Sequence, residues 1–112
     1  MPFGSHKTQI TAAVGLAICL FAAAACAAPD SVARGKEFAR ANCMRCHSIE
    51  KTGDSPVKAA PPFRTLHLKY PIQNLERPLA EGIITNHPTM PQFRLEPDQI
   101  GDVIAYLKTL ER

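Results

Sequence analysis

The sequence predicts an all-α domain of three to four helices joined by long loops. Apolar residues recur at three- and four-residue steps in residues 72–83 and 97–110, which is the period of an amphipathic helix. The segment before them, "KTGDSPVKAAPPFRTLHLKYP", spans residues 51–71. It holds four of the ten prolines and has no sustained period. That segment is typical of a loop, and no segment has the pattern of a βαβ unit.

The N-terminus has the layout of a secretory signal peptide. Residues 1–9 carry one lysine and no acid, residues 10–25 are almost wholly apolar, and small residues follow with an Ala-x-Ala motif ending at Ala27. We therefore expect residues 1–27 to be a cleavable signal peptide. Residues 28–112 are then one exported domain, with a periplasmic location.

Two alternatives would keep the chain at a membrane. An uncleaved signal is disfavoured because its 16 apolar, alanine-rich residues fall short of the ~20 of a spanning helix. A lipoprotein signal at Cys26 is weakened by Ala23, which stands where a larger aliphatic residue is expected. We expect membrane attachment only if Cys26 is lipidated or the signal stays uncleaved. Cys19 leaves with the signal, so the chemistry of the exported domain rests on Cys43 and Cys46.

The exported domain is small and close to neutral. Removing residues 1–27 leaves 85 residues and removes Lys7 but no acid, so the formal net charge falls from +3 to +2. A nucleic-acid binder carries a clustered basic face, so this balance argues against that class. The domain has no tryptophan, and a core this small is often completed by a disulfide, a metal or a cofactor.

The first helix is expected to begin at a capping residue, Asp30 or Ser31, and to run toward Cys43. One side of this helix is expected to carry Val32, Gly35, Phe38 and Ala39. These positions follow the helical period.

Two further helices follow the long loop. Pro78 interrupts the pattern of residues 72–83, so that helix is expected either to be kinked or to start afresh at Pro78. The last helix has Pro97 at its first position and acids in its first turn. Its apolar stripe is formed by Ile100, Val103, Ile104, Leu107 and Leu110.

The stretch "ANCMRCHSIE", residues 41–50, carries the chemistry. Cys-x-x-Cys-His in an exported protein is the haem attachment signature. Two thiols about one turn apart can each add across one haem vinyl group, and His47 is then held under the iron as the proximal ligand. The spacing predicts one haem c, covalently bound through Cys43 and Cys46.

The two cysteines allow three alternative interpretations. They are a disulfide between Cys43 and Cys46, a thioredoxin-like redox pair, and half of a zinc site. A thioredoxin-like pair belongs with a βαβ unit, and a structural zinc site needs four ligands. The haem reading is favoured because His47, the export signal and the helical pattern agree.

Four features in order along the chain extend this reading. A glycine and an aromatic residue, Gly35 and Phe38, precede "CMRCH"; "AAPPF" follows it; "HPTMPQF" lies before the last helix; and "IAYLKTL" lies within it. Together they resemble a class I c-type cytochrome, the small mono-haem periplasmic kind, over residues 30 to 110. The resemblance implies a cytochrome c fold wrapped around one covalent haem. Two departures are the three-residue step from Gly35 to Phe38, where four is usual, and Pro78.

The resemblance also implies roles for single residues. The carbonyl of Pro61 would orient the His47 ring, Met90 would be the distal iron ligand, and Tyr106 would pack near the crossing of the first and last helices. Arg64 and Tyr70 would lie in the loop along the haem edge, where a guanidinium or phenol can hold a propionate. Solvent exposure is the alternative for both.

Met90 is favoured as a ligand on its own chemistry as well. A thioether is a soft ligand that favours ferrous iron, and Met90 lies in a polar, proline-bounded loop rather than on a helical stripe. A gap-filling core residue is the alternative. Met44 lies inside the haem motif and cannot easily reach the opposite face. His67 or His87 can replace methionine and would give a bis-histidine iron.

Basic residues near the haem motif are candidates for attracting an acidic redox partner. They are Lys36, Arg40, Arg45, Lys51 and Lys58. A solvated face is the alternative meaning of this charge run.

These features predict an electron carrier whose iron cycles between Fe(III) and Fe(II), and not an enzyme, because two axial side chains leave no open position for a substrate. Its partners are expected to be donor and acceptor redox proteins, and the chain a monomer or a subunit of a redox complex. The alternatives are a five-coordinate haem sensor or peroxidase-like domain, the cytochrome subunit of a larger dehydrogenase or oxidase complex, and a cofactor-free disulfide or metal domain.

Overall fold

The computed structural model describes residue 4, residues 29–83 and residues 89–112. The expected signal peptide, apart from Gly4, and the candidate ligand His87 lie outside these residues. Within them, no helix has both the length and the apolar character needed to cross a bilayer.

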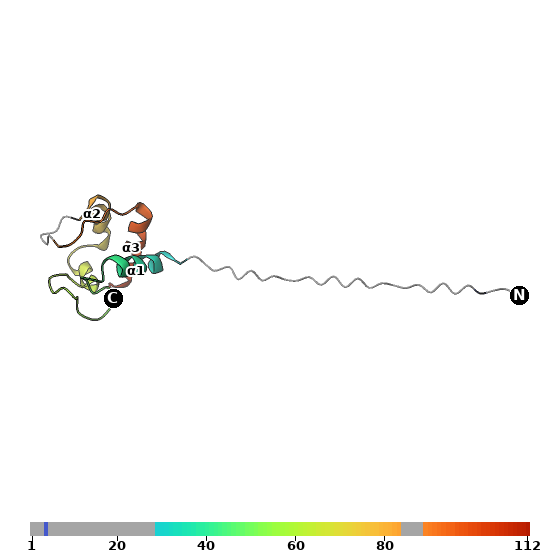
Figure 1. Ribbon diagram of the computed structural model, residues 1–112, viewed down its shortest axis with the longest axis horizontal. Coiled ribbons are helices and arrows are strands. Elements are labelled where there is room, and N and C mark those ends of the chain that lie inside the picture. Colours follow the sequence, from blue (N-terminus) through green and yellow to red (C-terminus); the bar gives the residue numbers. More distant parts are fainter. Residues whose placement is uncertain (1–3, 5–28, 84–88) are drawn as a thin grey trace.

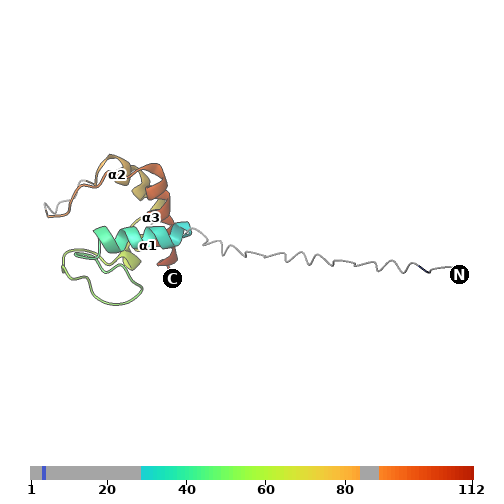
Figure 2. The same ribbon diagram turned by 45° about the vertical axis from the view of Figure 1, so that its right-hand side comes forward.

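The described residues form three α-helices and two 3₁₀-helices, with no strand among them (Figure 1). In chain order they are α1 (Ser31–Asn42), η1 (Phe63–Leu68), η2 (Ile72–Leu75), α2 (Glu76–Glu81) and α3 (Pro97–Thr109). The predicted all-α class is confirmed. The most extensive contact between elements joins α1 and α3, which cross one another in both views (Figures 1 and 2).

Helix α1 begins where the sequence predicts. Asp30 is the N-cap, and its Oδ1 accepts a hydrogen bond of 2.8 Å from the backbone N–H of Ala33. This bond satisfies one of the N–H groups that have no partner in the first turn of a helix. At the other end, the N–H of Cys43 still donates to the carbonyl of Ala39 at 2.8 Å, so the first cysteine of the haem motif caps α1.

The middle of the chain differs from the sequence-based prediction in two places. Helix α2 begins at Glu76 and continues directly from η2, so it neither starts at Pro78 nor is kinked there. Pro78 lies in the first turn, where a backbone N–H has no acceptor within the helix and its loss costs little. The segment expected to be loop contains η1, whose three-residue turns leave no 3.6-residue period to detect.

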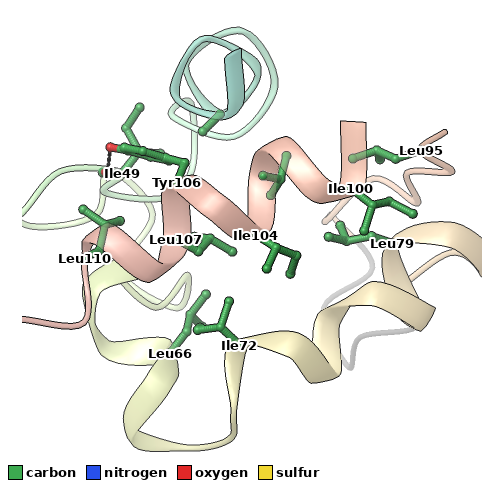
Figure 3. Close-up of a cluster of buried hydrophobic side chains, with 12 residues drawn as sticks. Ile49, Leu66, Ile72, Leu79, Leu95, Ile100, Ile104, Tyr106, Leu107 and Leu110 are labelled. Carbon is green, nitrogen blue, oxygen red and sulfur yellow. Dashed lines mark hydrogen bonds between the residues drawn. The ribbon is translucent and has the colours of Figure 1, made fainter. Parts of the chain in front are cut away.

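Helix α3 confirms the prediction for the C-terminal segment. Pro97 is its first residue, and a capping box joins Glu96 to Gln99, with the N–H of Glu96 donating to Gln99 Oε1 at 3.1 Å. Its apolar stripe is buried and packs on side chains of η1, η2, α2 and the segment before α3 (Figure 3). The core residues that these four segments contribute are Leu66, Ile72, Leu79 and Leu95.

The crossing of α1 and α3 depends on a glycine. A Cβ at Gly35 would overlap the carbonyl oxygen of Asp102 and lie 2.9 Å from Tyr106 Cβ. The Arg34 guanidinium donates to both carboxylate oxygens of Asp102, each at 2.8 Å, and holds the pKa of that carboxyl below its ordinary value. Tyr106 is buried at the crossing, as expected, and its hydroxyl donates to the carbonyl of Ile49 at 2.5 Å (Figure 3).

The close approach at Gly35 yields a prediction. Gly35→Ala forces the two backbones apart, so we expect the free energy of unfolding to fall by about 3 kcal/mol. Gly101, within α3, is a matched control because a Cβ there meets nothing within 4 Å; Gly101→Ala should raise the free energy of unfolding by about 0.5–1 kcal/mol. Denaturant unfolding of the holoprotein measures both. Equal effects of the two substitutions would contradict the role given to Gly35.

Candidate haem site

The haem motif continues the coil of α1 by one turn. The N–H groups of Cys46 and His47 both donate to the carbonyl of Cys43, at 3.1 and 3.0 Å. The N–H of Val57 then donates to the carbonyl of Cys46 at 3.1 Å. The two cysteines and the histidine are therefore fixed by backbone hydrogen bonds at the end of a helix that is itself fixed against α3.

The imidazole of His47 has a defined tautomer. Its Nδ1 lies 2.8 Å from the carbonyl oxygen of Pro61, and a carbonyl can only accept, so Nδ1 carries the proton. In the neutral ring with this tautomer, Nε2 carries the lone pair, which is the form of histidine that binds a metal. The ring of Phe63 lies beside the imidazole, with ring centroids 4.9 Å apart and planes 39° apart.

Side-chain hydrogen bonds close the loop after the motif. The N–H of Ser48 donates to Ser55 Oγ at 2.9 Å, and Arg64 Nη1 donates to the carbonyl of Gly53 at 2.7 Å and to Ser48 Oγ at 3.3 Å. Gly53 has a φ of 92°, which suits glycine. Arg64 therefore holds this loop closed, and it is not among the described residues that line the cavity below. Its role toward a propionate stays a prediction.

A cavity of about 350 Å³ opens beside the haem motif. Cys43, Cys46 and His47 line it, and so does Met90, from the segment before α3. The other lining residues are Ala41, Asn42, Arg45, Val57, Ala59, Ala60, Thr89, Pro91 and Phe93. The structure thus brings both predicted attachment points and both predicted iron ligands to one cavity whose walls are mainly apolar.

The chemistry of this donor set fits a covalently bound haem. Both cysteines are free, as thioether formation requires. Burial raises the pKa of the Cys43 thiol to about 11, so this environment favours a neutral sulfur, and a thioether is neutral at every pH. The zinc alternative finds no support within residues 29–83 and 89–112, where no group of three or more His, Cys, Asp or Glu side chains is arranged to bind a metal.

Two further candidate residues, Tyr70 and His67, lie elsewhere in the structure. Tyr70 is half-buried, and burial raises the pKa of its phenol; its role toward a propionate stays a prediction. His67 lies in η1, and its buried Nδ1 has no hydrogen-bond partner among the described residues. Neither residue is among the described residues that line the cavity.

Of the basic residues near the haem motif, Lys36 forms an ion pair with Glu50 at 3.1 Å. Arg45 is exposed and lines the cavity.

The sequence did not reveal two aromatic residues of the site. Phe63 contacts His47, and Phe93 lines the cavity and packs edge-on against Phe38, with ring centroids 6.4 Å apart. Phe38 thus contacts the segment beside the cavity, whereas Gly35 lies directly against the backbone of α3. No periodic pattern marks either aromatic, although each lies one or two residues after a proline that borders a predicted site residue.

A helical domain in which a Cys-x-x-Cys-His motif lines a cavity is typical of proteins with covalently bound haem. Comparison with known proteins identifies the family. The cytochrome c family model matches residues 32–111, so the chain belongs to the cytochrome c family. Family membership implies covalent haem c, and the two cysteines that it requires are present. It also implies haem-based electron transfer.

Two relatives illustrate the range of the family. The chain is 30% identical over 97 residues to cytochrome c-552 of Bradyrhizobium diazoefficiens, covering 83% of this chain and 91% of that protein. It is 31% identical over 86 residues to the cytochrome bc1 complex cytochrome c subunit of Corynebacterium diphtheriae, covering 72% of this chain. The chain spans only 28% of the length of that subunit. No solved structure matches significantly.

The loop closed by Arg64 yields a second prediction. Arg64→Met keeps an unbranched, apolar stem but removes the hydrogen bonds from the guanidinium to Gly53 and Ser48, so we expect the free energy of unfolding to fall by about 1–2 kcal/mol. Lys69→Met, at an exposed position just after η1, is the control and should change it by less than about 0.5 kcal/mol. Denaturant unfolding of the holoprotein measures both, and a neutral Arg64→Met would contradict the role of Arg64 in the loop.

Proposed function

We propose that this chain is an exported electron carrier with a single haem c, attached through Cys43 and Cys46 and ligated by His47 and Met90. The observation that carries the proposal is the single cavity that these four residues line. They come from two segments far apart in the sequence. The chemistry of each side chain suits the role it is given.

His47 acts as the proximal ligand through Nε2. The hydrogen bond from Nδ1 to Pro61 fixes the tautomer and increases the basicity of the ring. A more basic imidazole donates more charge and favours ferric iron. Because the carbonyl belongs to a proline with restricted backbone rotation, the acceptor stays in place in both oxidation states.

Met90 acts as the distal ligand. Its thioether is soft and weakly basic, so it favours ferrous iron and raises the reduction potential relative to a second imidazole. When bound, the haem supplies an iron that gains or loses one electron. With His47 and Met90 both holding the iron, no position would be left for a substrate, and the protein would transfer electrons without catalysing a bond change.

The proposed compartment follows from the sequence. Residues 1–27 act as an export signal and the domain works in the periplasm. Covalent attachment through two sulfur atoms keeps the cofactor in a compartment where it cannot be replaced readily. The partners are then a donor and an acceptor redox protein.

A second candidate function is that of a haem subunit in a membrane redox complex. It is supported by the likeness to the cytochrome c subunit of a bc1 complex. In that case the exported protein would migrate with other subunits when membranes are solubilised gently, whereas a free carrier migrates alone at the size of one chain.

Attachment through both cysteines can be tested directly. Cys43→Ala and Cys46→Ala each remove one thioether, so we expect the yield of covalent holoprotein to fall severely in both. Met44→Ala is the control, because Met44 lies between the cysteines and is exposed, and its yield should match the unsubstituted protein. Haem staining after denaturing electrophoresis, normalised to total chain, gives the yield. Normal yields of covalent holoprotein from both cysteine variants would contradict haem attachment at Cys43 and Cys46.

The distal ligand can be tested by exchanging the candidates. Met90→Ala should open the sixth position to water and convert the ferric iron from low spin to high spin. Met90→His should keep the iron low-spin and lower the reduction potential by a sizeable part of the ~0.8 V that axial ligands span. His67→Ala and His87→Ala should leave ligation intact. Optical spectra and potentials of the four variants decide the point. Loss of low-spin iron in a histidine variant, with Met90→Ala unchanged, would make this a bis-histidine cytochrome.

A further inference from the structure

Phe63 lies against the imidazole of His47. The ring centroids are 4.9 Å apart and the planes are inclined by 39°, which is within the range of favourable aromatic contact. Phe63 is the first residue of η1 and is partly buried against the core. It comes two residues after Pro61, whose carbonyl accepts the hydrogen bond from His47 Nδ1.

The backbone holds Phe63 in fixed register with the haem motif. The N–H of Phe63 donates to the carbonyl of Ser48 at 2.9 Å, and the residue before Ser48 is His47 itself. Residues 61–63 therefore form hydrogen bonds with two consecutive residues, with the side chain of His47 and with the backbone of Ser48. Pro62 stands between these two bonds and restricts the backbone rotation there. The carbonyl and the aromatic ring thus reach His47 from one rigid segment.

The hydrogen bond alone does not determine the plane of the imidazole. Hydrogen bonds to a carbonyl oxygen have a broad angular distribution, so the ring can tilt about the line from Nδ1 to the oxygen and still keep the bond. A flat ring packed at 4.9 Å blocks the tilt toward its own side. A second, non-polar contact can fix the remaining angle, and the ring of Phe63 supplies it.

We propose that Phe63 is a positioning residue that sets the plane of the His47 imidazole together with the Pro61 carbonyl. The inference rests on the proposed function, in which His47 is the proximal ligand. Its consequence is electronic: in low-spin ferric haem, the plane of an axial imidazole determines how the unpaired spin is distributed over the porphyrin. Phe63 thereby influences an observable of the iron without contributing an atom to its ligation.

The test measures paramagnetic ¹H NMR shifts of the haem methyl groups in ferric holoprotein. Phe63→Leu keeps a large apolar side chain but removes the flat ring, so we expect low-spin iron to be retained while the pattern of methyl shifts changes. Phe63→Tyr keeps the ring and should restore the original pattern. Phe38→Leu is the matched control, because the ring of Phe38 pairs with Phe93; it should lower stability and leave the pattern in place.

The outcomes separate the inference from the proposed function. Methyl shifts in Phe63→Leu that match those of the unsubstituted protein, or that change equally in Phe38→Leu, would overturn the positioning role. If Phe63→Leu does not accumulate, Phe63→Met is measured by the same criterion. Absence of low-spin, histidine-ligated iron in the unsubstituted protein would instead overturn the proposed function, before any variant is compared.

Discussion

The contact between the backbones of α1 and α3 at Gly35 is the constraint on which the rest of the domain depends. Because position 35 has no Cβ, the carbonyl of Asp102 can approach α1 directly, and the ion pair from Arg34 to Asp102 joins the same two helices. Tyr106 then reaches the carbonyl of Ile49, two residues beyond His47. The helix crossing therefore fixes both the end of α1, where the haem motif begins, and the chain just after the motif.

From this crossing the site is built by a short series of hydrogen bonds. Arg64 and Ser48 close the loop after the motif, and the closed loop returns Pro61 and Phe63 to the imidazole of His47. Met90 reaches the same cavity from the segment that leads into α3. A one-electron carrier benefits from this arrangement because rigid ligands change little between oxidation states. The protein's part in the proposed function is thus to hold two side chains and two sulfur atoms in fixed positions.

The parts that the sequence predicted well are those with local causes. The cap at Asp30 and the start of α3 at Pro97 depend on residues a few positions apart. The errors have non-local or non-periodic causes. Helix η1 has no 3.6-residue period, and α2 begins before Pro78 because a first turn tolerates proline. The partners of Arg64 and the contact of Phe63 with His47 are tertiary contacts, which no pattern within either segment encodes.

In the proposed function, one haem is attached at Cys43 and Cys46 and ligated by His47 and Met90. The mass and the optical spectra of the unsubstituted, exported protein test it most directly. We predict a mass raised by one haem that survives denaturation, low-spin spectra in both oxidation states, and a weak far-red charge-transfer band in the ferric form, which reports a sulfur ligand. A chain without covalent haem, a high-spin ferric spectrum, or low-spin iron without the far-red band would contradict the account.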